Sequence, residues 1–187
     1  PDGLPEDASQ GAAVGLRFEG ADPRARPAGR LRQAGARHWL RGADPEGWIT
    51  DVPSYERLRW RELYEGVDLV LRGSGGRVEY DLHLQPGADL DQVVVRCDGA
   101  LGLELLDSGD LVHTALGPLR QSAPETFAVD AGGALESVPC RFRLLGEGRF
   151  GFRVPDEHLG RGLWIDPVLE WGTFLGGSHS DGALDVV

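Results

Sequence analysis

The sequence predicts an all-β protein: an antiparallel, sandwich-like domain with short helical or 3-10 turns. Apolar and polar residues alternate over many short segments, which is the pattern of a strand with one face in a core. Glycine-rich turns separate these segments at intervals of about ten residues, a spacing typical of β-sandwiches. No segment shows the period of about 3.6 residues that marks an amphipathic helix.

The first strand is expected after a polar lead. Residues 1–13 are rich in Gly, Ala and Pro, and we expect them to be disordered or extended. The all-β domain is expected to span residues 14–170, beginning with "VGLRFEG", in which Val14, Leu16 and Phe18 alternate with polar residues. The segment "RHWLRGADPEGW" then predicts a short strand closed by an Asp-Pro turn.

The segment "DVPSYERLRWRELYEGVDLVLRG" predicts strand, turn and strand. Leu58 and Trp60 alternate with arginines, as in a half-buried strand. We expect "WRELYEG" to form a single helical or 3-10 turn that ends at Gly66. Asp68, in the next strand, faces away from its apolar neighbours, and we expect it to join a structural ion pair near Arg57. Tyr64 is expected to lie beside this pair.

The sequence "GSGG" at residues 73–76 predicts a hairpin turn. A phosphate-binding glycine loop must lead into a helix, because the helix N-terminus holds the anion. Here the next segment alternates strictly, so no helix follows. One face of that segment is apolar and comprises Val78, Tyr80, Leu82 and Leu84. The other face is polar and comprises Glu79, Asp81 and His83.

Further short strands are expected along the rest of the chain. They are "QVVVRC", "LGLELL", "DLVHTAL", "PLRQSAP", "ETFAVD", "ESVPCRFRLL", "RFGFRVP" and "LWIDPVLEWGTFL". The turn sequences "DSGD", "DAGGA" and "GEG" lie between some of them.

The charge of the chain excludes several classes of partner. A net charge of −11 opposes binding to nucleic acid and insertion into or adsorption on anionic membranes. No apolar run reaches the roughly 20 residues that cross a bilayer. Arginines between Arg24 and Arg41 form a local exception, either an anion-binding strip or a solvated face with local ion pairs. Residues 1–15 have no signal-peptide pattern, and we expect position 1 to be a boundary rather than a native start.

Residue types that are missing from the chain exclude some catalytic chemistry. There is no Lys, and therefore no Walker-type phosphate loop, Schiff base or lysine general base. There is no Asn, and therefore no N-glycosylation acceptor and no Cys-His-Asn triad. The histidines have no HxxxH or HExxH spacing, which argues against zinc. Ser178, His179 and Asp181 follow one another too closely to form a relay, and we interpret them as turn residues.

Carboxylate pairs are the remaining chemical signal. Glu79 and Asp81 share one face of a strand, and Asp89 and Asp91 follow a turn. A glycosidase uses two carboxylates across a groove, but a solvated sheet face produces the same alternation. Calcium held by carboxylates is an alternative for an acidic exported protein, although no D-x-D-x-D-G loop is present. We therefore predict no catalytic residues and no cofactor.

Cysteines and tryptophans provide the other candidate residues. Cys97 and Cys140 either form a disulfide or are buried free thiols on separate strands. The tryptophans are expected mainly in the core, and the alternative is an interaction or sugar-stacking surface. That candidate surface comprises Trp39, Trp48, Trp60 and Trp171.

Several motifs resemble a known family in their sequence and order. They are "GADPRA", "DVPSYERLRWRELYEGVDLVLRGSGGRVEYDLHLQPGAD", "SGDLVHTALGPLRQSAPETF" and "LWIDPVLEWGTFLGGSHSDGALDVV". This order resembles a bacterial surface domain that precedes SBBP-type β-propeller repeats in large exported proteins. Leu71-Arg72 and Trp171-Gly172 depart from the usual residues, but they are compatible with strands. The resemblance implies no catalytic activity.

The resemblance implies where the chain acts. It places the protein outside the cell or on a bacterial surface, and makes residues 171–187 the truncated start of a propeller repeat. The expected function is non-catalytic: to position or cap the propeller and to contribute to adhesion or assembly. The expected partner is the downstream propeller, or another chain docked at a strand edge. The alternative is a carbohydrate-binding or carbohydrate-active domain that contacts a glycan through tryptophans or paired carboxylates.

Overall fold

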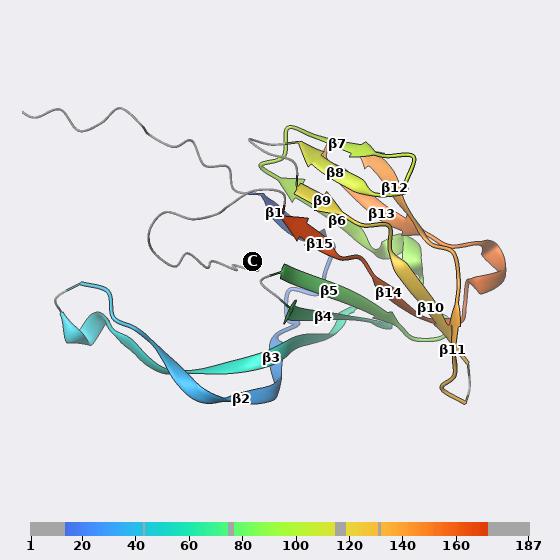
Figure 1. Ribbon diagram of the computed structural model, residues 1–187. Coiled ribbons are helices and arrows are strands. Elements are labelled where there is room, and N and C mark those ends of the chain that lie inside the picture. Colours follow the sequence, from blue (N-terminus) through green and yellow to red (C-terminus); the bar gives the residue numbers. More distant parts are fainter. Residues whose placement is uncertain (1–13, 43, 75–76, 115–118, 131, 172–187) are drawn as a thin grey trace, which may run out of the picture.

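The computed structural model describes residues 14–42, 44–74, 77–114, 119–130 and 132–171. These residues form an all-β protein with three antiparallel sheets, and no α-helix occurs among them (Figure 1). The predicted lead and the predicted propeller segment after Trp171 lie outside the described residues, as do Ser178, His179 and Asp181. No helix in the described ranges is long and apolar enough to span a membrane.

Most of the strand pairs in the three sheets join strands that follow one another in the sequence. The seven-stranded sheet has the order β11 (Leu135–Ser137), β10 (Glu125–Val129), β14 (Gly162–Asp166), β5 (Arg77–Leu84), β4 (Val67–Ser74), β3 (Ile49–Tyr64) and β2 (Pro27–Trp39). One four-stranded sheet has the order β1 (Gly15–Glu19), β6 (Val94–Asp98), β13 (Arg149–Arg153) and β12 (Arg141–Gly146). The other has the order β15 (Leu169–Trp171), β9 (Leu119–Gln121), β8 (Leu111–Thr114) and β7 (Gly102–Leu105). Three 3-10 turns connect strands: η1 (Pro45–Gly47), η2 (Leu90–Gln92) and η3 (Asp156–His158).

The predicted hairpin at "GSGG" is confirmed. β4 and β5 pair antiparallel without a register shift from Val67↔Leu84 to Ser74↔Arg77. The apolar face of β5 lies in the core, where Tyr80, Leu82 and Leu84 are buried. The polar face of the same strand is on the outer side of the sheet, as its alternation predicts.

The predicted turn at "WRELYEG" is wrong in its first part. β3 continues as a strand through Tyr64, and the chain turns only at Glu65 and Gly66. Gly66 has φ +69°, and a Cβ at this position would lie 2.9 Å from the Cβ of Ala88. Sheet pairing with β4 outweighs the local helical preference because it extends the ladder as far as Tyr64↔Val67.

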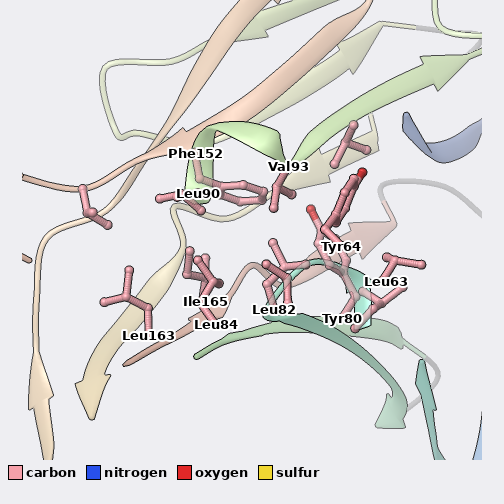
Figure 2. Close-up of a cluster of buried hydrophobic side chains, with 14 of the residues drawn as sticks. Leu63, Tyr64, Tyr80, Leu82, Leu84, Leu90, Val93, Phe152, Leu163 and Ile165 are labelled. Atoms are coloured by element: carbon pink, nitrogen blue, oxygen red, sulfur yellow. The ribbon is translucent and has the colours of Figure 1, made fainter. Parts of the chain in front are cut away.

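The core lies between the seven-stranded sheet and the sheet that contains β13. Phe142, Phe150 and Phe152 are almost fully buried, with ring centroids 5.5 to 5.9 Å apart. Figure 2 shows Phe152 and Val93 on one side of this core, facing Leu82 and other apolar residues on the opposite side. Burial of this apolar surface from several strands is the main favourable contribution to folding.

A chain of polar groups crosses the buried region near β8 and β9. The Tyr80 hydroxyl donates to Gln121 Oε1 at 2.8 Å, and Gln121 Nε2 lies 2.5 Å from His113 Nε2. Because the amide oxygen already accepts from Tyr80, the amide nitrogen donates to His113 Nε2 and the imidazole carries its proton on Nδ1. Nδ1 is buried without a hydrogen-bond partner among the described residues. Burial lowers the pKa of His113 to about 4.

Candidate functional site

The most exposed part of the sheet system is a two-stranded ribbon that projects from the remaining strands (Figure 1). Arg57↔Arg72 is the outermost pair between β3 and β4, so only β2 accompanies β3 beyond it. We call residues 30–57 the arm and the remaining described residues the body. In the arm the strands have one neighbour instead of two, and nearly every side chain is exposed.

The end of the arm presents aromatic and aliphatic side chains. Trp39 and Ile49 are a directly opposed pair, and their exposed fractions are 55% and 60%. Trp48 is 37% exposed and donates from Nε1 to the Gly42 carbonyl at 3.1 Å. Asp44 Oδ1 accepts from the Glu46 backbone N–H at 3.0 Å and thereby caps η1. Residues 44–48 therefore form a hydrogen-bonded turn next to exposed apolar groups.

The predicted tryptophan surface is divided by the fold. Trp39 and Trp48 lie exposed on the arm, whereas Trp60 is only 5% exposed. Trp60 follows the main expectation of core burial and is not part of the alternative surface, because its side chain lies on the core side of β3, opposite Leu69. The side chain of Trp171 is outside the described part of the structure.

The outer face of the seven-stranded sheet gathers the predicted carboxylate pair around one arginine. The Arg72 guanidinium lies 2.9 Å from Glu79, 3.2 Å from Asp81 and 2.5 Å from Asp166. Burial and the neighbouring Asp166 carboxylate raise the pKa of Asp81 to about 7, although Arg72 opposes this shift. The cluster therefore takes up a proton near neutral pH. Sequence reasoning missed Asp166, which comes from the distant strand β14.

Asp68 forms the expected structural ion pair, but with a different arginine. It accepts from Arg59 Nε at 2.9 Å and from the Glu62 backbone N–H at 2.7 Å. Arg57 lies opposite Arg72 instead. Tyr64 points elsewhere: its hydroxyl donates to the Glu19 carbonyl at 2.9 Å, and burial raises its pKa to about 12.

An exposed aromatic ring that the sequence reasoning missed lies beside this outer face. Trp164 on β14 is 43% exposed and stacks on His83, with ring centroids 4.9 Å apart and an angle of 15°. Burial and the nearby Arg59 lower the pKa of His83. The alternation of side chains along a strand could have predicted this exposure. In "LWID", Trp164 lies between two core residues, so its side chain faces the opposite side of the sheet.

The other predicted carboxylate pair has structural roles. Asp89 Oδ1 accepts from the Asp91 backbone N–H at 2.9 Å and caps η2. The Asp91 side chain pairs with Arg143 at 2.8 Å. Within the described ranges, no group of three or more His, Cys, Asp or Glu side chains is arranged to hold a metal ion.

Cys97 and Cys140 are free thiols in the structure. Cys97 lies on β6 and donates its backbone N–H to Gly148, whereas Cys140 directly precedes β12 opposite the far end of β13. Cys97 is level with Gly148 and Cys140 with Val154, so six residue steps along β13 and its two ends separate them, or about 20 Å along a strand. A disulfide requires Cα atoms within about 7 Å. The register therefore favours the alternative of two thiols on separate strands.

Comparison with known proteins identifies a family but no activity. A family model described as "Domain of unknown function (DUF7948)" matches residues 3–168. The chain belongs to this family. No curated protein and no solved structure matches the chain. The function of this DUF7948 domain must therefore be argued from its own surface.

Proposed function

We propose that this DUF7948 domain is a non-catalytic interaction module whose arm docks onto a following β-propeller or onto another chain. The observation that carries the proposal is the two-stranded ribbon of residues 30–57 with apolar side chains exposed along it. A ribbon of two strands is marginally stable in water unless another surface covers it. Contiguous exposed apolar groups are typical of protein interfaces.

The chemistry of the arm's end fits a docking role. Tryptophan is enriched among the residues that contribute most to binding, and truncating such a residue costs about 2 kcal/mol or more. Trp39, Trp48 and Ile49 supply this kind of surface at the point farthest along the ribbon. The Trp48 hydrogen bond and the Asp44 cap hold the turn before a partner arrives, which lowers the entropy cost of binding.

The resemblance described above supplies the expected context. In that context the module lies outside the cell or on a bacterial surface, and the partner is a β-propeller that follows it or another chain. The arm then positions the propeller or caps it. Residues 171–187 would begin the first propeller repeat.

Hydrogen exchange tests this proposal. The 187-residue chain would be compared, amide by amide, with the same chain extended by the propeller repeats that the proposal expects. We expect the amides of residues 30–57 to exchange rapidly in the isolated chain and slowly in the extended chain. Trp39→Ser combined with Trp48→Ser should restore rapid exchange. The matched control is Leu101→Ser, which changes an exposed body residue. Equal, rapid exchange in both proteins would contradict docking within the chain.

A second candidate function is glycan binding at Trp164. The observation that favours it is the exposed Trp164 ring stacked on His83, on the same outer sheet face as Asp81 and Asp166. Sugar rings stack on exposed aromatic faces, and carboxylates accept their hydroxyl hydrogen bonds. A glycan array followed by tryptophan-fluorescence titration tests it. Binding should be lost in Trp164→Ala and kept in Trp48→Ala, and a uniformly negative array would remove this candidate.

A further inference from the structure

The edge of the seven-stranded sheet at β2 is open. β2 is the last strand in the sheet order, and within the described ranges its only strand partner is β3. All of its residues except Gly29 are exposed. An edge strand presents unpaired backbone N–H and C=O groups, which are a template for an added strand.

The charge on this edge strand is entirely basic. β2 contains Arg30, Arg32 and Arg37 and no Asp or Glu, although the chain has 30 acidic and 19 basic residues. None of these three arginines makes an ion pair with a described residue. Many arginines of the body do have ion-pair partners, and Arg72 alone contacts three carboxylates.

The register places like charges side by side at the base of the arm. Arg30 lies opposite Arg57, and Arg57 lies opposite Arg72, so three arginines form a row across β2, β3 and β4. Like charges directly opposite each other destabilise a sheet. The carboxylates at Arg72 neutralise only one end of this row, and Arg30 and Arg57 have no ion-pair partner among the described residues.

We propose that the outer edge of β2 binds an extended, carboxylate-rich segment of a partner protein as an additional strand. This inference rests on the proposed docking function and names the chemistry of the partner. Backbone hydrogen bonds along β2 would give the segment its register, and Glu or Asp side chains would pair with Arg30, Arg32 and Arg57. Arg37, beyond the register shift between Arg32 and Ala36, would meet the end of the segment.

Other occupants of the edge are less favourable. A second copy that paired β2 with β2 would bring arginines against arginines, which opposes self-association. A nucleic acid would meet the strongly negative charge of the remaining chain. It would also leave the backbone edge unpaired. A carboxylate-rich strand satisfies both the backbone groups and the guanidinium groups.

The first test uses a fluorescently labelled peptide of about ten residues in which Glu alternates with Thr, a length within the range of natural strands. Its binding to the 187-residue protein would be followed by fluorescence anisotropy. We expect Arg30→Gln combined with Arg57→Gln to weaken binding about fivefold or more, because two exposed ion pairs are lost.

The control is a matched pair of arginines in the body. Arg141 and Arg153 are also directly opposed, on β12 and β13, so Arg141→Gln with Arg153→Gln makes the same change of charge on another sheet. This control should bind within about twofold of the wild-type protein. Equal weakening by both double variants, or no binding of the peptide, would overturn the proposal. Far-ultraviolet circular dichroism checks that both variants fold.

The second test distinguishes strand addition from attraction by charge alone. The peptide is made in two versions, N-methylated at odd or at even positions, which block opposite edges of an extended chain. One version should bind like the parent peptide and the other should lose about tenfold or more in affinity. Strand addition would be overturned if the two methylated versions bound with equal affinity, whether both bound like the parent peptide or both failed to bind.

The outcomes separate this inference from the docking function on which it rests. If the acidic peptide fails but the arm is protected in the extended chain, docking stands and the chemistry assigned to the partner is wrong. If sedimentation shows a dimer that Arg30→Gln with Arg57→Gln changes, while the peptide does not bind, the occupant is a second copy and the proposal is overturned. Binding of heparin or duplex DNA in place of the peptide would overturn it as well.

Discussion

The two halves of β3 show how differently one strand can be used. Near its end Trp60, Leu63 and Tyr64 are buried, and Trp60 pairs with neighbours on both sides. Near its start Ile49, Val52 and Tyr55 are exposed, and only β2 accompanies them. The same strand therefore contributes to the core in the body and to a free surface in the arm. Stability should be concentrated in the body, and binding in the arm.

The largest expected effect is a cavity in the body. Phe150 is fully buried and packs edge-on against Phe142 and Phe152. Phe150→Ala should lower the free energy of unfolding by about 3–5 kcal/mol, because it loses apolar burial and leaves a cavity. Urea denaturation measures this. If the free energy of unfolding fell by less than about 1 kcal/mol, the core of the body would not be the main source of stability.

Acid should destabilise the body through His113. Its pKa is lowered to about 4 in the folded protein, against about 6.5 in an unfolded chain. The unfolded state therefore binds the proton first, and stability is full above pH of about 6.5 and falls as the pH drops toward about 4. The total loss should be about 3 kcal/mol.

Denaturation at several pH values checks this expectation. His113→Gln should remove the part of the loss that falls between pH values of about 6.5 and about 4, whatever its effect at neutral pH. Asp81 works in the opposite direction, because its raised pKa of about 7 favours the folded state at low pH and loses that effect as the pH rises. Asp81→Asn is therefore the control: in this variant the stability should still fall on acidification through His113. An unchanged acid slope in His113→Gln would contradict the assignment.

Two glycines with positive φ, Gly66 in the turn after β3 and Gly35 within β2, allow the body and the arm to be compared. Gly66 has φ +69° and no room for a Cβ beside Ala88, so Gly66→Ala should cost about 2 kcal/mol. Gly35, in the arm, has φ +90° with no atom within 4 Å of an added Cβ. Gly35→Ala should strain only the arm and change global unfolding by less than about 0.5 kcal/mol. Equal losses would show that arm and body unfold together.

The smallest effect on stability is expected at the end of the arm. Trp39→Ser with Trp48→Ser removes side chains that are 55% and 37% exposed and lie outside the core, so global unfolding should change by less than about 0.5 kcal/mol. Calorimetry checks this. A loss of several kcal/mol would mean that the end of the arm packs in solution, and would weaken the proposal that it serves a partner.

Much of the fold was predictable where the pattern is local. The hairpin of β4 and β5 followed from alternation on both sides of a glycine turn, strict only after it, and the outward face of Glu79 and Asp81 followed from that strict alternation. The strand ending at Tyr64 was not predictable, because pairing with β4 overrides a local turn preference. The candidate site was least predictable: Trp60 and Trp39 both lie in segments that predict a strand, yet one is buried and the other exposed.

The sequence by itself determined the all-β class, the positions of several turns and the exclusion of lysine- and asparagine-dependent chemistry. These properties depend on residue types and on short-range alternation. Only the tertiary structure decided that β2 and β3 extend beyond the end of β4. It also decided that Asp68 pairs with Arg59, and that Asp166 and Asp81 both contact Arg72. These contacts depend on which strands become neighbours and how far their ladders extend. Which strands pair depends on the burial of apolar surface from distant parts of the chain, and a local sequence pattern does not contain that information.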